Sequence, residues 1–429
     1  MDYDDYPLEL GPRVRRLLLG AALLALVLLA GVVALRLHGI SRLEELRRDI
    51  AVVGPADPEA WAPTVAPPES NAVRRMVAVA EDLEPADDTL RGLSSRRPEE
   101  WMAEEWAAVR RRLAAQADTL VELHRAARLP GGGLGLDYGA GGSDESGMGT
   151  PFGNVLGAID LLRTDAVEAA WSGDRERTLT GVATLSRLGA LLAAEPQPIA
   201  QAVSQVATTA ALLASRETLA LQGAPAGYPE RLRAALGPAP PATGPCRALA
   251  WQTLRLAGPG AAQRVRRMTD GRRWAVASRV AGEWLMAEAL RSRPALATGC
   301  GRPWAPLMAA VDAARSRWRL GPLESFDAEA RGLLLRAAAV HAAQRLADLA
   351  LELAAGGAAG APYPASLAGA RRGIDPLTGT RPDYGRRLDG SAWLALEAAE
   401  EKSHSRSGLR SVPYFWVLPP PAGTSPSVP

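Results

Sequence analysis

The sequence predicts a mainly α-helical protein: a single N-terminal transmembrane helix, an irregular α-helical body, and a small C-terminal antiparallel β-sheet packed on a long helix. Ala and Leu dominate the 429 residues and β-branched residues are scarce, which favours helix over strand. An uncharged run near the N-terminus is long enough to cross a bilayer. Near the C-terminus, turn residues separate short segments that are typical of strands.

The apolar run from Leu17 to Leu35 contains nineteen residues and no charge. As a helix it would be about 28 Å long, close to the ~30 Å hydrocarbon core of a bilayer. The alternative is a signal peptide cleaved after Val32-Val33-Ala34, but the run exceeds the usual ~7–15 apolar residues of such peptides. We therefore expect an uncleaved anchor over 17–37, with the lipid bilayer as its partner through 17–35.

Arginines flank this run on both sides, three upstream and four downstream, so the positive-inside rule barely decides the orientation. They are Arg13, Arg15, Arg16, Arg36, Arg42, Arg47 and Arg48. We expect a short cytoplasmic tail and a large periplasmic or extracytoplasmic part, which places the chain in the inner (cytoplasmic) membrane as a single-pass protein.

The helix is expected to continue beyond the anchor through 41–50. Five prolines between 54 and 70 then predict a semi-rigid spacer. Pro98 suits a first helical position and predicts a helix to about residue 128. Further helices are predicted over 152–173, 175–195, 199–222, 262–291, 304–318 and 326–353.

A glycine-rich loop occupies 130–149, and it fits no nucleotide-binding or nucleophile motif. It lacks the third glycine of a dinucleotide fingerprint, the lysine of a P-loop, and the G-x-S-x-G pattern of a nucleophile elbow. We interpret it as a mobile surface connection that binds no nucleotide, with 136–138 as its one docked segment.

The C-terminal part predicts a three-stranded sheet. Asp389-Gly390 marks a tight turn between DYGRRL and SAWLALE, and VPYFWVL over 412–418 is the third strand. The domain boundaries expected from these patterns are 1–16 for the tail, 17–37 for the anchor, 38–71 for the juxtamembrane helix and spacer, 72–325 for the helical body, 326–418 for the long helix and β module, and 419–429 for a disordered tail.

Charge and side-chain chemistry predict no catalytic residue, no metal site and no cofactor. The net charge is +2, which gives no global field for nucleic acid. The densest basic cluster comprises Arg264, Arg266, Arg267, Arg272, Arg273 and Arg279. We interpret it as solvated surface, with contact to anionic headgroups as the alternative, because no nucleic-acid reader motif accompanies it.

Four histidines, at 38, 124, 341 and 404, show no zinc-binding spacing. His124 and His341 are interpreted as structural residues in helices. The two cysteines, Cys246 and Cys300, lie in Pro/Gly-rich breaks and are candidates for a disulfide, which an extracytoplasmic location favours. The alternative is two unrelated thiols.

Two regions carry a resemblance to a known group of proteins. The first is the block from Leu136 through SGDRERTL to Ala200, and the second is a C-terminal YPASL…DPLTG…Y segment. Its turn-motif residues are Tyr363, Pro364, Asp375, Pro376, Gly379 and Tyr384. Both regions resemble uncharacterised, membrane-anchored, Ala/Leu-rich bacterial proteins. The second is also weakly similar to the tail of type II secretion pseudopilins, whose cleavage motif and calcium loop are missing here.

The resemblance implies a membrane-tethered, externally facing helical protein. Together with the anchor, it leads us to expect a non-catalytic interaction or assembly protein of the cell envelope, with envelope proteins as partners. The alternative is an envelope enzyme, of the hydrolase or another class, whose site is assembled from distant residues. A pocket around His124 or His341 with a hydrogen-bonded carboxylate would favour the enzyme, and an apolar surround would favour the interaction protein.

Overall fold

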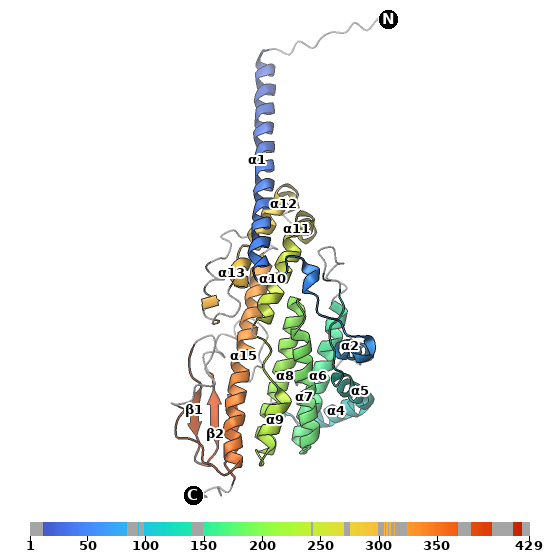
Figure 1. The fold of residues 1–429 in the computed structure, drawn as a ribbon, viewed down its shortest axis with the longest axis vertical. Coiled ribbons are helices and arrows are strands. Elements are labelled where there is room, and N and C mark those ends of the chain that lie inside the picture. Colours follow the sequence, from blue (N-terminus) through green and yellow to red (C-terminus); the bar gives the residue numbers. More distant parts are fainter. Residues whose placement is uncertain are drawn as a thin grey trace.

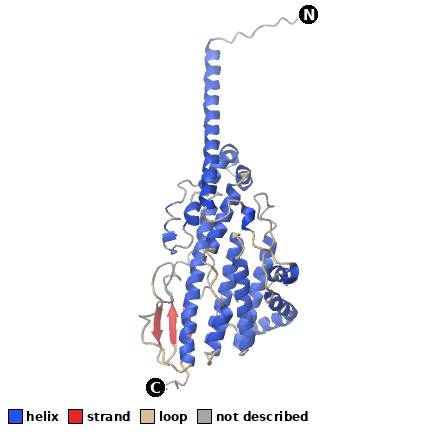
Figure 2. Cartoon of the chain, in the orientation of Figure 1, coloured by secondary structure: helices blue, strands red, loops and turns tan. Residues whose placement is uncertain are grey.

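The structure is a computed structural model. It describes residues 12–83, 93, 98–136, 138, 149–241, 243–269, 275–298, 304, 306–307, 309, 313, 324–367, 379–396 and 415–422. Within them the chain is predominantly helical, with one small antiparallel sheet, which confirms the predicted fold class. A long helix, α1, projects from one end of a helical body, and the sheet lies beside α15 towards the other end (Figures 1 and 2).

Helix α1 (Pro12–Ala51) is continuous from the apolar run into the body, as predicted. Its first part is exposed on almost every side, whereas Gly39, Leu43, Leu46 and Ile50 are buried. Their spacing of three and four residues places them on one face. The first part of α1 therefore exposes an apolar surface, whereas its last part, from Gly39 onward, packs against the body.

The proline-rich segment after α1, expected to be a spacer, contacts the body over part of its length. It contains two short 3₁₀ turns, η1 (Pro58–Trp61) and η2 (Pro68–Ser70). Trp61 is buried, and its indole N–H donates to the carbonyl of Pro55 at 2.6 Å. The buried Trp61 packs in one cluster with Ile50 of α1, which fixes this part of the segment against the body.

Three short helices follow where the sequence predicted one. Helix α2 (Ala72–Glu81) was not predicted, and α4 (Ala103–Ala115) and α5 (Ala117–Ala127) replace the single helix expected over 98–128. The interruption lies at Gln116, whose backbone leaves the helical region at φ −107° and ψ 19°. Propensity alone carries no signal for this break, because Gln is a good helix former.

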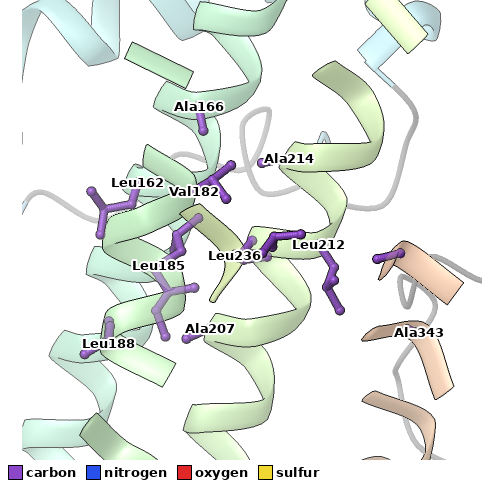
Figure 3. Close-up of a cluster of buried hydrophobic side chains, with 14 of the residues drawn as sticks. Leu162, Ala166, Val182, Leu185, Leu188, Ala207, Leu212, Ala214, Leu236 and Ala343 are labelled. Carbon is purple, nitrogen blue, oxygen red and sulfur yellow. The ribbon is translucent and has the colours of Figure 1, made fainter. Parts of the chain in front are cut away.

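The centre of the body consists of α6 (Gly149–Ser172), α7 (Arg175–Ala193) and α8 (Pro198–Gln222), which pack on one another as predicted. Figure 3 shows their interdigitated Leu, Val and Ala side chains. A Cβ added to Gly181 of α7 would lie 2.8 Å from the Cβ of Ala166 in α6. Helices α6 and α7 therefore approach as closely as these small residues allow.

The remaining helices complete the body. They are α9 (Tyr228–Leu236), α10 (Gly244–Ala257), α11 (Ala261–Thr269), α12 (Ala275–Ala289), α13 (Arg293–Thr298) and α15 (Glu324–Ala358). The helix expected over 262–291 is thus two helices, α11 and α12. Most of the helix expected over 304–318 lies outside the described residues.

The C-terminal sheet has the order β1-β2-β3, with β1 (Asp383–Arg386), β2 (Ala392–Ala395) and β3 (Phe415–Leu418) all antiparallel. Its inner face buries Leu394, Trp416 and Leu418, and it packs against α15 as predicted and also against α8. The sheet therefore belongs to the main core.

The turn-motif residues tie this sheet to the chain before it. The Tyr363 hydroxyl donates to the carbonyl of Pro419, and the Tyr384 hydroxyl donates to the carbonyl of Pro364, both at 2.7 Å. Gly379 has a φ of 71°, a conformation that favours glycine. Asp375 and Pro376 lie outside the described residues.

Replacement of Trp416 by Ala tests the docking of the sheet. Because this side chain is fully buried among residues of the main core, we expect Trp416→Ala to lower the free energy of unfolding by about 3–5 kcal/mol. Trp393 lies on the other face and stacks on Phe415, so Trp393→Ala should cost only about 1 kcal/mol. Chemical denaturation of both full-length variants in detergent measures this difference, and equal losses would contradict the packing described here.

Candidate functional site at the base of the anchor helix

Helix α1 is, among the described residues, the one helix long and apolar enough to cross a membrane. Its leucines are strongly exposed, with Leu17 at 73% and Leu29 at 64%. Exposure of an apolar surface on all sides of a helix is costly in water and is what a bilayer covers. This bare segment ends at Arg36, and the first contacts with the body follow immediately.

Helix α1 approaches the body closely at Gly39. A Cβ added there would lie only 2.4 Å from the backbone nitrogen of Trp284 in α12. One turn earlier, the Arg36 guanidinium pairs with the Glu283 carboxylate at 3.2 Å. Glycine therefore lets the backbones of α1 and α12 touch at the point where the apolar segment ends.

A second close approach joins α12 to α11. A Cβ added to Gly282 would lie 2.9 Å from the Cα of Ala262. Ala261 and Val265 turn their side chains into a small core with Leu285 and Met286 of α12, and Leu43 and Leu46 of α1 line the same core. Figure 1 shows α11 and α12 beside α1, at the end of the body from which α1 projects.

The arginines of the basic cluster identified in the sequence lie in different environments in the structure. Arg264 turns inward, and its Nη2 donates to the carbonyls of Leu256 and Gly258 at 3.1 and 2.8 Å. It thereby satisfies the carbonyl groups at the end of α10, and burial lowers its pKa. Arg266, Arg267 and Arg279 are exposed. Arg272 and Arg273 lie outside the described residues.

His124, one of the two histidines considered as a catalytic candidate, lies among polar groups. Its Nδ1 is 2.8 Å from the Thr184 hydroxyl, and its Nε2 is 3.8 Å from an Asp165 carboxylate oxygen, beyond hydrogen-bond distance. Arg177 Nε donates to the same carboxylate at 2.9 Å and its Nη1 donates to Glu168 at 2.8 Å.

This cluster joins α5, α6 and α7, and Arg177 engages both of its carboxylates. Burial alone would raise the pKa of Asp165, but His124 and Arg177 hold it below its ordinary value. A carboxylate engaged by arginine is less able to orient a histidine as a base. A hollow on another side of α6 is lined by residues that include Trp101, Arg112 and Asp160, and none of the cluster residues lines it.

His341 has an aromatic neighbour, Trp304, at 6.0 Å between ring centroids, and burial lowers its pKa. His38 is exposed on α1, and His404 lies outside the described residues. Among the residues that the structure describes, no group of three or more His, Cys, Asp or Glu side chains could hold a metal.

The glycine-rich loop is docked over a longer stretch than expected. The Asn71 amide donates to the carbonyls of Gly132 and Gly133, and the Leu134 N–H donates to the Glu195 carboxylate at 2.6 Å. The Tyr138 hydroxyl donates to the same carboxylate. The expectation that only 136–138 docks is therefore wrong, because the loop exchanges hydrogen bonds with 66–72 from Gly131 onward. Asp137 and 139–148 lie outside the described residues.

Cys246 is buried in the first turn of α10, against Leu249, Trp304 and Leu333. Cys300 lies outside the described residues, so the disulfide between them stays a prediction.

Sequence reasoning missed the residues that join α1 to the body. Gly39 carries a readable signal: it is a small residue that opens the stripe Gly39-Leu43-Leu46-Ile50. Trp284 and Glu283 carry no such signal, because a single sequence does not reveal which distant helix a stripe will meet.

No family model matches this chain, and no curated protein or solved structure matches it either. The resemblance to anchored bacterial proteins accordingly stays an expectation.

Substitution of Gly39 tests the contact between α1 and α12. A Cβ at this position meets backbone rather than a flexible side chain, so we expect Gly39→Ala to lower the free energy of unfolding by about 1–3 kcal/mol. Gly31 lies on the same helix with nothing within 4 Å of its added Cβ, and Gly31→Ala is the matched control without loss. Thermal unfolding in detergent compares the two, and an unchanged Gly39→Ala protein would disprove the close approach.

The buried carboxyl group of Glu195 should make the free energy of unfolding depend on pH. Burial raises its pKa above the ordinary 4.5, against the hydrogen bonds from Tyr138 and Leu134 that lower it. The folded state then holds this proton more tightly than the unfolded state. The resulting stabilisation is complete below the unfolded pKa and is lost as the pH rises through the folded pKa.

Glu195→Gln keeps the shape of the side chain and cannot ionise. From about pH 4 to 7, the free energy of unfolding of the wild-type protein should fall relative to that of Glu195→Gln. Glu230→Gln, at an exposed position, serves as the control for the chemical change from Glu to Gln. A difference between wild type and Glu195→Gln that does not vary with pH would contradict this assignment.

Proposed function

We propose that this chain is a single-pass membrane protein and a non-catalytic interaction or assembly protein of the cell envelope. It would be anchored in the bilayer through 17–35, with its large C-terminal part on the periplasmic or extracytoplasmic side. The observation that carries the proposal is the continuity of α1, which is bare and apolar in one half and part of the core in the other.

This continuity supports a scaffold more than a tethered enzyme. Because Gly39 contacts the backbone of α12 directly, the body is held at a fixed height and angle relative to the anchor. A fixed placement suits a protein that must meet a partner in the same membrane. An enzyme acting on a freely diffusing substrate gains nothing from it.

A candidate contact surface lies far from the anchor. Trp171, at the end of α6, is 43% exposed and stacks on Trp106 with ring centroids 4.8 Å apart. Helix α7, which has nineteen residues and is about 28 Å long, separates it from Glu195 near the anchor end. Exposed tryptophans are enriched in protein–protein interfaces, so we assign Trp171 to partner binding.

The anchoring half of the proposal predicts the behaviour of the chain in membrane fractions. The full-length protein should stay in the membrane pellet through an alkaline carbonate wash. Leu24→Arg with Leu26→Arg should move it to the supernatant, because each arginine at the centre of a membrane helix costs about 2.5–3.5 kcal/mol. Leu24→Phe with Leu26→Phe is the matched apolar control. A double-arginine variant that still pellets would reveal another attachment and contradict the proposal.

The partner half is tested on the same membranes. A photo-crosslinking residue at position 171 should capture one or a few envelope proteins, identified by mass spectrometry, and the same residue at exposed Arg231 should not. Capture at position 231 alone, or no capture at either position, would contradict an interaction role for this surface.

A further inference from the structure

Helix α11 lies at the level where the anchor leaves the bilayer. The apolar run ends at Leu35, Arg36 pairs with Glu283, and Gly39 touches Trp284. Residues 36 and 39 are only about 4.5 Å apart along a helix axis. Gly282, the neighbour of Glu283, touches Ala262 of α11. A chain of direct contacts therefore links α11, through α12, to the part of α1 just beyond the expected end of the hydrocarbon core.

The two sides of α11 differ sharply in chemistry. Ala261 and Val265 are buried against α12, and Met268 is partly buried in the same core. Gln263, Arg266 and Arg267 are exposed on the other side. The helix, AAQRVRRMT, contains no acidic residue. Its outer side is therefore a purely cationic and polar surface.

Neighbouring elements add positive charge to this surface. The Arg266 Nη2 donates to the carbonyl of Arg279, which places the exposed Arg279 of α12 beside α11. Arg36 remains 51% exposed despite its ion pair. The side chain of Glu283 on α12 is only 14% exposed and is engaged by Arg36.

We propose that α11, through Arg266 and Arg267 and with Arg279 of α12, binds the anionic phosphate-bearing headgroups of the bilayer that holds α1. This inference rests on the proposed anchoring. The headgroup layer adds about 5–8 Å to each side of the hydrocarbon core, and charge attraction there acts over about 8–10 Å. Helix α11 is linked through α12 to α1 just beyond this core, and guanidinium groups are suited to phosphate oxygens.

Headgroup binding gives the exposed arginines of α11 a role in addition to their contacts within the protein. Within the protein, Arg264 satisfies the carbonyls at the end of α10, and Arg266 donates to the carbonyl of Arg279 in α12. Contact with headgroups would fix the tilt of the body as well as its height, because α1 and α11 would then touch the bilayer at two separate points.

The test uses the full chain in nanodiscs of phosphatidylcholine alone or with one-third phosphatidylglycerol. Hydrogen exchange of the amides in 261–269 is measured in both. Each exposed arginine should favour the headgroup-bound state about fivefold on an anionic surface. Exchange should therefore be slower in the anionic discs, and 0.5 M salt should remove most of the difference.

Arg266→Gln with Arg267→Gln should bring the exchange rate in anionic discs to that in phosphatidylcholine discs. Arg110→Gln with Arg111→Gln, another exposed adjacent pair, on α4 away from the anchor, should leave the lipid effect unchanged. Should the first variant exchange faster in both disc types, Arg266→Lys with Arg267→Lys separates charge from folding, because it must restore the lipid effect.

Equal exchange of wild-type α11 in the two disc types would overturn the proposal, as would a lipid effect that survives in the Gln pair or fails to return in the Lys pair. Slower exchange on adding a single-stranded oligonucleotide to phosphatidylcholine discs, without any effect of phosphatidylglycerol, would assign the surface to nucleic acid and also overturn it. A chain that does not enter nanodiscs at all would refute the anchoring itself, which distinguishes the two failures.

Discussion

The close approach of α1 and α12 at Gly39 is the contact on which the rest of the arrangement depends. Because no side chain separates the two backbones there, the apolar segment cannot swing freely relative to the body. The same crossing sets the level of α12, and through Gly282 and Ala262 it sets the level of α11. One missing Cβ thus sets how the body is placed relative to the apolar half of α1.

Small side chains have the same role inside the body. Gly189 lies against Thr208 and the carbonyl of Ser204, so α7 and α8 approach almost to backbone contact. Helix α8 is buried along most of its length, and several of its hydroxyls donate to its own backbone carbonyls, as Thr208 does to Ser204 and Ser215 to Ala211. An Ala-rich composition lets this central helix be enclosed, and bonds of this kind satisfy Thr208 and Ser215 inside the core.

The sequence predicted the elements better than their contacts. The apolar run, the helices around Gly173-Asp174 and the hairpin at Asp389-Gly390 carry local signals, namely hydrophobicity, periodicity and turn residues, and the structure confirms them. Proline content between 54 and 70 predicted a spacer, whereas Trp61 in this segment is buried. The docking of Leu134 and Tyr138 on Glu195 depends on a carboxylate far along the chain, and local pattern carries no trace of it.

Rigid coupling of anchor and body is the central claim, and a distance distribution tests it most directly. Nitroxide labels at Leu29 on the bare half of α1 and at Arg110 on α4, in a full-length protein with Cys246 and Cys300 replaced by Ala, can be measured by pulsed electron spin resonance in nanodiscs. A continuous α1 docked on α12 should give a single narrow distance distribution. A broad distribution, typical of a body on a flexible tether, would contradict it.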